Sequence, residues 1–129
     1  MILALYERLT PDYCFSDERG NLVQLAHAGY RQINILESKK GVVRGDHYHK
    51  QASEAFYVVN GSLEVTLKKG VEQEQARFRK GDFFLIPPGV MHSLFFNETC
   101  TLVALYDIPV EKEDGTKDIY CEENKNEGN

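Results

Sequence analysis

Three histidines and one glutamate are the residues of this chain whose types and spacing best suit chemistry. His47, His49 and Glu54 lie in one short segment, and His92 follows in a second segment further along the chain. Side chains two residues apart on a strand point to the same face, so we expect His47 and His49 to project together. Three imidazole nitrogens and one carboxylate oxygen suit a divalent first-row metal and leave coordination positions open for a ligand. The pattern therefore predicts a metal site.

The elements that position these residues are expected to be short strands separated by turns. Alternating or apolar segments predict strands at 22–26, 32–37, 55–59, 62–67, 76–79, 83–86, 93–96 and 101–106. The segment 32–37 reads as a half-buried strand. Asn60-Gly61 between two β-rich runs predicts a type I′ hairpin, in which both central residues take positive φ. No window of ten or more residues has the 3.6-residue period of a helix, so we expect an all-β sandwich or closed barrel.

The size and composition predict one soluble globular domain. The chain has 129 residues, of which 42% are hydrophobic and 27% are charged. Its net charge of -5 argues against nucleic acid or an anionic membrane as the main partner, since both require a basic surface. The N-terminus does not read as a signal peptide, and no segment is apolar enough to cross a membrane. Three widely spaced cysteines, Cys14, Cys100 and Cys121, read as free thiols, so we predict a cytoplasmic protein.

The organisation changes near residue 110. We expect residues 1–110 to form the barrel together with N-terminal strands, and residues 111–129 to form a polar C-terminal segment. The end of that segment has almost nothing to bury and is expected to be disordered. Ile119 and Tyr120 are the exception, and we expect them to dock as a short edge strand.

The histidine segments resemble the two sequence motifs of the cupin family. The matching patterns are Gly41-x5-His47-x-His49-x4-Glu54-x6-Gly61 and Gly81-x5-Pro87-x-Gly89-x2-His92. The resemblance implies a single-domain cupin-type jelly-roll β-barrel (a double-stranded β-helix), commonly a homodimer, with His47, His49, Glu54 and His92 holding one metal ion. Zn, Fe, Mn, Ni and Co all suit this ligand set, so the identity of the metal stays open.

A second resemblance concerns nucleotide-sugar cupins. The segments 15–22 and 43–50 resemble parts of dTDP-4-dehydrorhamnose 3,5-epimerases and of dTDP-sugar 3,4-ketoisomerases, which share an Arg-Gly-x-His segment. The resemblance implies an isomerase or epimerase that moves a proton next to the ketone of a nucleotide-linked keto sugar. Arg19, Arg44 and Lys50 are then candidates for binding the diphosphate, because cationic side chains pair with phosphate oxygens.

The proton carrier is open between two sets of residues. His47 or His49 suits the role, because imidazole titrates near neutral pH. A histidine that binds metal is a poor base, however, and in that case a metal-bound water, Tyr48 or Tyr106 is the better carrier.

Alternative functions follow from the same site. A metal cupin can also be an iron-dependent dioxygenase or a sugar-phosphate isomerase, since a fold does not fix a reaction. A third possibility is a non-catalytic module that binds or senses a small molecule.

Overall fold

The computed structural model describes residues 4–121, which form eleven β-strands and no helix. No helix in this range is long and apolar enough to cross a membrane. The strands are β1 (Glu7–Arg8), β2 (Tyr13–Asp17), β3 (Gly20–Gln24), β4 (Gln32–Ser38), β5 (Val43–His47), β6 (Glu54–Asn60), β7 (Ser62–Lys69), β8 (Glu72–Arg79), β9 (Phe83–Ile86), β10 (Met91–Phe96) and β11 (Cys100–Tyr106).

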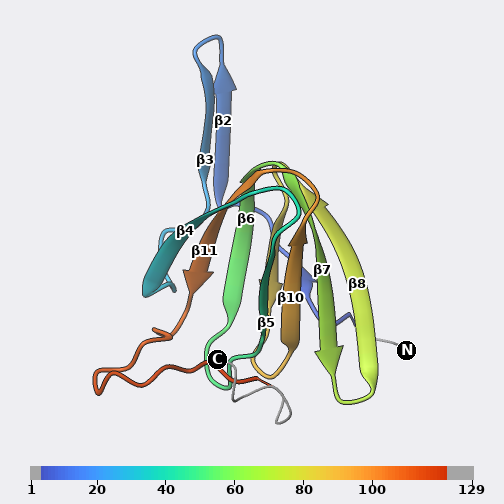
Figure 1. The fold of residues 1–129 in the computed structure, drawn as a ribbon. Helices are drawn as coiled ribbons and strands as arrows, with labels where there is room; N and C mark the ends of the chain where they lie inside the picture. The colour runs from blue at the N-terminus through green and yellow to red at the C-terminus, as the bar shows by residue number, and fades with distance from the viewer. Residues whose placement is uncertain (1–3, 122–129) are drawn as a thin grey trace.

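Two antiparallel sheets form the walls of the barrel (Figure 1). The five-stranded sheet has the order β1-β9-β6-β11-β4, and the four-stranded sheet has the order β5-β10-β7-β8. Strands β2 and β3 form a separate hairpin. The all-β cupin-type jelly roll expected from the sequence is confirmed.

The core lies between the two sheets and follows from the alternation of side chains along each strand. On β7, Leu63, Val65 and Leu67 are completely buried, whereas the residues between them are partly exposed. Phe78 of β8 and Phe84 of β9 stack with ring centroids 3.6 Å apart. Burial of this apolar surface is the main stabilising term for such a barrel.

The prediction of a hairpin at Asn60-Gly61 is wrong. Strands β6 and β7 flank this dipeptide as expected, but they belong to different sheets, so the chain crosses from one wall of the barrel to the other here. Gly61 has a φ of 85°, and a Cβ on it would overlap the Thr99 carbonyl oxygen and lie 2.8 Å from Cys100 Cα. Gly61, with its positive φ, thus allows a tight turn that packs closely against the residues at the start of β11.

Strand β4 is confirmed, but the face on which its isoleucines lie was unexpected. Ile33 and Ile35 are 63% and 72% exposed, whereas Leu36 packs against the core. The half-buried strand predicted from the sequence therefore has two of its apolar residues on the outer side of the five-stranded sheet.

The two ends of the barrel carry different attachments (Figure 1). The β2–β3 hairpin projects beyond one end, whereas the C-terminal segment runs across the other. That segment is tied to the chain after β5 by a bridge between Tyr48 and Tyr120. Tyr120 docks as expected, but through an isolated bridge and not as an edge strand, and Ile119 is exposed. The tail expected to be disordered lies, from residue 122 on, outside the described residues.

Candidate functional site

The four residues singled out by the sequence lie together at the barrel end crossed by the C-terminal segment. His47 is the last residue of β5, Glu54 is the first of β6, and His92 is the second of β10. His47 pairs with His92 across the β5–β10 ladder, and their ring centroids lie 4.9 Å apart. One ligand atom from each of His47, His49, Glu54 and His92 lies within 4.8 Å of the others.

A β-bulge on β5 directs His47 towards this cluster. Gly45 pairs with Ser93 and His47 pairs with His92, so Asp46 is an extra residue in the ladder. Gly45 and Asp46 both have positive φ, at 90° and 66°. A bulge of this kind bends the strand and re-aims the side chains that follow it.

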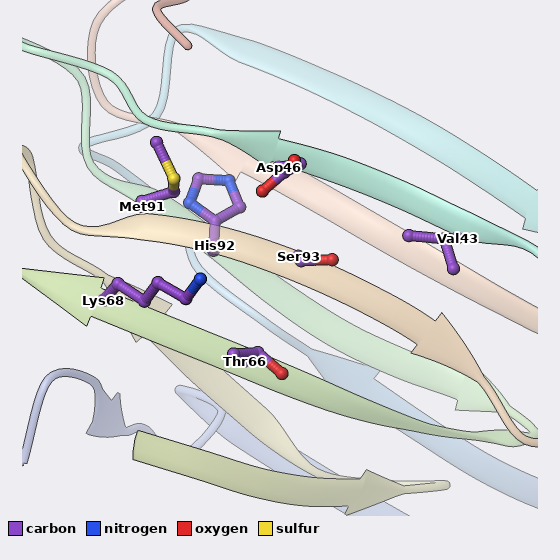
Figure 2. Close-up of a pocket in the computed structure, with 7 residues that line it drawn as sticks. All are labelled: Val43, Asp46, Thr66, Lys68, Met91, His92 and Ser93. Carbon is purple, nitrogen blue, oxygen red and sulfur yellow. The ribbon is translucent and has the colours of Figure 1, made fainter. Parts of the chain in front are cut away.

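The bulge also borders a hollow of about 210 Å³ between β5, β10 and β7, shown in Figure 2. Thr66 and Lys68 of β7 line it, and they alternate with the core residues Val65 and Leu67, so the hollow lies on the outer side of the sheet. Asp46 and His92 also line it. His92 therefore borders both this outer hollow and the cluster inside the barrel.

His49 lies just after β5, and its position depends on the C-terminal segment. The amide and carbonyl of Tyr48 each hydrogen-bond to Tyr120, at 2.9 Å, and this keeps the chain extended beyond His47. The side chains two residues apart therefore lie on one side, with the rings of His47 and His49 5.1 Å apart.

Backbone carbonyls fix the orientation of two of the histidines. His49 Nδ1 donates to the Asp118 carbonyl at 2.6 Å, and His92 Nδ1 donates to the Val90 carbonyl at 3.1 Å. A carbonyl oxygen can only accept, so the proton is on Nδ1 in both rings. Both Nε2 atoms then face Glu54 Oε1, at 3.0 Å from His49 and 3.3 Å from His92.

The donor set fits a divalent first-row metal. His92 Nε2 is buried and makes no hydrogen bond to any residue in the range 4–121, although it lies near the carboxylate. Ligand atoms about 2.1 Å from one ion lie roughly 3 to 4 Å apart, close to the spacing in this cluster. A nitrogen anchored through the opposite ring nitrogen is the usual arrangement of a histidine metal ligand.

Glu54 of the cluster forms a buried hydrogen-bonded pair with Tyr106. Tyr106 donates its hydroxyl to Glu54 Oε2 at 2.7 Å, and both residues are buried. Burial alone would raise the pKa of Glu54, but the neighbouring rings of His49 and His92 and the hydroxyl of Tyr106 lower it to about 2. Burial and the charge of Glu54 raise the pKa of Tyr106, so its hydroxyl stays protonated and acts as a donor.

His47 and His49 have pKa values shifted in opposite directions. Burial, together with the neighbouring His92 and His49, lowers the pKa of His47 to about 4. For His49, burial would lower the pKa, but the hydrogen bonds to Glu54 and to the Asp118 carbonyl raise it. His47 is also the one member of the four-residue cluster that is partly exposed.

Three other predicted site residues, Tyr48, Lys50 and Arg44, make their contacts outside the four-residue cluster. The Tyr48 ring packs against Tyr120, with centroids 5.6 Å apart, and Lys50 places its ammonium 4.2 Å from the centre of the Tyr120 ring. Arg44 donates to Ser38 Oγ and to the carbonyl of Glu37 on β4, and so bridges the edges of the two sheets.

Arg19 lies far from the cluster, near which its predicted role in binding the diphosphate would place it. It sits in the turn between β2 and β3 and binds Asp17 at 2.6 Å. The hairpin projects from the barrel end opposite the histidines (Figure 1). Arg19 therefore does not reach the cluster of its own chain.

Asp118 was not predicted from the sequence, although it touches the cluster. It is 1% exposed and belongs to the polar C-terminal segment. An aspartate in a charged run carries no local sign of burial, and only the docking expected for the following residues indicated that this segment contacts the barrel.

The chain thus has the cupin-type jelly-roll fold, with a cluster of three imidazoles and one carboxylate at one end of the barrel. The sequence from residue 15 to residue 106 matches the model of the family described as "Polysaccharide biosynthesis C-terminal domain", and the chain belongs to this family. No curated protein matches the sequence.

Several solved structures share the fold. A sugar 3,4-ketoisomerase from Thermoanaerobacterium thermosaccharolyticum in complex with TDP has a TM-score of 0.78 and 21% identity, over 95% of this chain and 92% of that chain. A mutant of that enzyme in complex with TDP-4-keto-6-deoxyglucose has a TM-score of 0.74 and 21% identity, over 88% and 87% of the two chains. A dTDP-4-dehydrorhamnose 3,5-epimerase from Sulfolobus tokodaii has a TM-score of 0.65 and 19% identity, over 80% and 75%.

Proposed function

We propose that the protein is an isomerase or epimerase that moves a proton next to the ketone of a nucleotide-linked keto sugar. The convergence of His47, His49, Glu54 and His92 at one end of the barrel is the observation that carries the proposal. The fold shared with a 3,4-ketoisomerase and a 3,5-epimerase of nucleotide sugars supports it.

The reaction has two requirements that this cluster meets. Removing a proton next to a ketone needs a base, and the resulting enolate needs stabilisation of its negative oxygen. We propose that His47, His49, Glu54 and His92 hold one divalent metal, which when bound supplies Lewis-acid stabilisation of that oxygen. Because His47 is the partly exposed member, we infer that the sugar approaches the cluster from its side.

The same residues can act without metal, and the pKa values favour a division of roles. His47, with its lowered pKa, is neutral and can accept the proton, whereas His49 forms a charged pair with Glu54. Two neighbouring groups with pKa values shifted apart are a common acid–base arrangement. With metal bound, His47 becomes a ligand, and the proton must pass through another carrier.

Cations near the site are the proposed contacts of the nucleoside diphosphate. Lys50 lies on the turn that follows the histidines, and its side chain is held by Tyr120. Arg44 lies on the strand that carries His47. These two residues are our candidates within the same chain, because phosphate oxygens pair with guanidinium and ammonium groups.

We also propose a homodimer, supported by the apolar residues that one chain leaves exposed. Ile33 and Ile35 lie on the outer side of the five-stranded sheet, and Phe15 and Leu22 lie on the projecting hairpin. A second copy packed on these surfaces removes them from water. In such a dimer the hairpin extends beyond its own barrel, and Arg19 serves the site of the second copy.

The dimer has a direct test. Ile35→Asp should shift the mass measured by sedimentation from dimer towards monomer, whereas Val71→Asp should not. Val71 is fully exposed in the turn between β7 and β8, away from the proposed interface. A wild-type monomer at micromolar concentration would overturn the dimer proposal.

The cytoplasmic location likewise remains a proposal. It is supported by Cys14, Cys100 and Cys121, which are free thiols in the structure, as expected in a reducing compartment.

The reaction is tested by hydrogen exchange. The protein is incubated in deuterated water with dTDP- and UDP-linked 4-keto sugars, and NMR should show deuterium on the carbon next to the ketone. His47→Asn should abolish the exchange, and His27→Asn should preserve it, because His27 is exposed and pairs with Asp12 away from the cluster. Exchange that survives a chelator would assign the metal-free mode, and no exchange across the panel would overturn the proposed function.

A further inference from the structure

Asp118 is a buried carboxylate that ties the C-terminal segment to the turn between the histidines and β6. Its Oδ1 accepts the amide N–H of Lys50 at 2.9 Å, and its Oδ2 accepts those of Gln51 and Ala52 at 3.0 Å each. A carboxylate that is itself buried and accepts three backbone N–H groups resists displacement, because leaving would cost all three charge-assisted hydrogen bonds.

The same residue holds His49 through its main chain. The Asp118 carbonyl accepts His49 Nδ1–H at 2.6 Å. The side chain of Asp118 therefore fixes the turn that follows His49, and its backbone oxygen fixes the ring of His49. The bond pair between Tyr48 and Tyr120 holds the segment on its other side.

We propose that Asp118 is a positioning residue, which sets the tautomer and ring orientation of His49 so that Nε2 faces Glu54 and the centre of the cluster. A neutral imidazole can carry its proton on either nitrogen, and the partner of one nitrogen decides which form is present. Without an acceptor at Nδ1, the ring can rotate and place the wrong nitrogen at the centre. The inference rests on the proposed role of the cluster, but the tautomer can be measured without any activity.

The chain offers a matched control in the same segment. Asp114 also accepts a backbone N–H, from Thr116 at 2.9 Å, but it is exposed and makes this bond within its own turn. Asp114→Ala therefore removes a turn-capping carboxylate without touching His49. Asp118→Asn is the milder partner of Asp118→Ala, because one amide oxygen can keep the two bonds of Oδ2 while losing that of Oδ1.

Two measurements test the proposal. In ¹⁵N-edited NMR of the Zn²⁺-loaded wild-type protein, we expect the His49 Nδ1 proton to be protected from exchange with water. Asp118→Ala keeps the carbonyl but removes the side-chain bonds that hold it against His49, so this signal should be lost. Co²⁺ affinity, followed by visible absorption, should fall about 10- to 100-fold, as when other partners behind a metal ligand are removed. Asp114→Ala should match the wild type in both.

The outcomes separate the inference from the proposed function. If the wild type binds neither metal, the NMR comparison is made on chelated protein at alkaline pH, and it decides the role of Asp118 even though the metal proposal has failed. If Asp118→Ala does not fold, a partial loss of the Nδ1 signal in Asp118→Asn supports the role. A folded Asp118 variant with the wild-type His49 signal, or an equal effect of Asp114→Ala, would overturn it.

Discussion

Replacing Gly45 by alanine should disturb the cluster more than the same change four residues earlier. Gly45 and Gly41 have nearly the same φ, at 90° and 89°. A Cβ on Gly45 would lie 2.9 Å from the His92 carbonyl oxygen and 3.2 Å from Leu94 Cδ1, whereas a Cβ on Gly41 would have nothing within 4 Å. The pair therefore separates backbone strain from contact with the strand that carries His92.

The magnitudes follow from these two terms. A non-glycine residue held at positive φ costs on the order of 1 to 3 kcal/mol, and both variants bear that cost. Forcing a methyl group into a packed contact costs about 1 to 3 kcal/mol more, and only Gly45→Ala bears it. We expect a loss of about 1–2 kcal/mol for Gly41→Ala and about 3–4 kcal/mol for Gly45→Ala, on the basis of these ranges.

Urea unfolding of chelated protein measures the stability difference, and Co²⁺ titration measures the effect on the site. Relief of the contact moves β5 away from β10, and this separates His47 from His92. Metal affinity should therefore fall at least about tenfold in Gly45→Ala and stay near the wild-type value in Gly41→Ala. Equal destabilisation and equal affinity in the two variants would refute the role assigned to the bulge.

Three further predictions concern single side chains. In chelated protein, the pKa of Glu54 is lowered from 4.5 to about 2, so its ionised form stabilises the fold above pH 4.5, and this stabilisation is lost as the pH falls towards 2. The stabilisation amounts to about 3 kcal/mol. Urea unfolding of Glu54→Gln between about pH 6 and pH 3 should therefore lack the loss of stability on the acid side. Tyr106→Phe removes the 2.7 Å bond to the Glu54 carboxylate and should cost about 1.5–3 kcal/mol at neutral pH; an unchanged unfolding midpoint would contradict this. Arg19→Ala should leave the urea unfolding midpoint unchanged, since its ion pair with Asp17 is exposed, while raising KM for a nucleotide sugar because the hairpin is proposed to serve a second copy. An unchanged KM would remove Arg19 from the site.

The strands could be predicted because their signals are local. The apolar run at Phe83–Ile86 and the turn residues after it mark β9 without knowledge of its neighbours. The same holds for β7, where Leu63, Val65 and Leu67 alternate with polar residues. Periodicity of two and turn residues are properties of the segment itself.

Which strands pair with one another, and which face of a strand is covered, could not be predicted in the same way. Asn60-Gly61 has the composition of a hairpin turn, yet its two strands pair with β9, β11, β8 and β10 rather than with each other. Which sheet a strand joins depends on segments distant in the chain. The exposure of Ile33 and Ile35 follows from the same cause, since alternation shows that a strand has an apolar face but not what covers it.

The same difference between local signals and distant contacts explains which residues of the candidate site could be predicted. Motif spacing singled out His47, His49 and Glu54 in one short segment and His92 in a second one, without knowledge of the fold. Asp118 was not predicted from the sequence, because its contact with His49 spans 69 positions. Arg19 was assigned by resemblance alone, and its distance from the cluster became visible only in the fold.

The metal content of the purified protein tests the central claim most directly, that His47, His49, Glu54 and His92 form one metal site. Elemental analysis of protein prepared without chelators and without a histidine tag should find about one first-row metal ion per chain, as expected for three imidazoles and a carboxylate. His92→Ala should be depleted of it, and His27→Asn should not. A metal-free wild-type protein that does not take up Zn²⁺, Fe²⁺, Mn²⁺, Ni²⁺ or Co²⁺, and whose His92→Ala variant behaves identically, would contradict the claim.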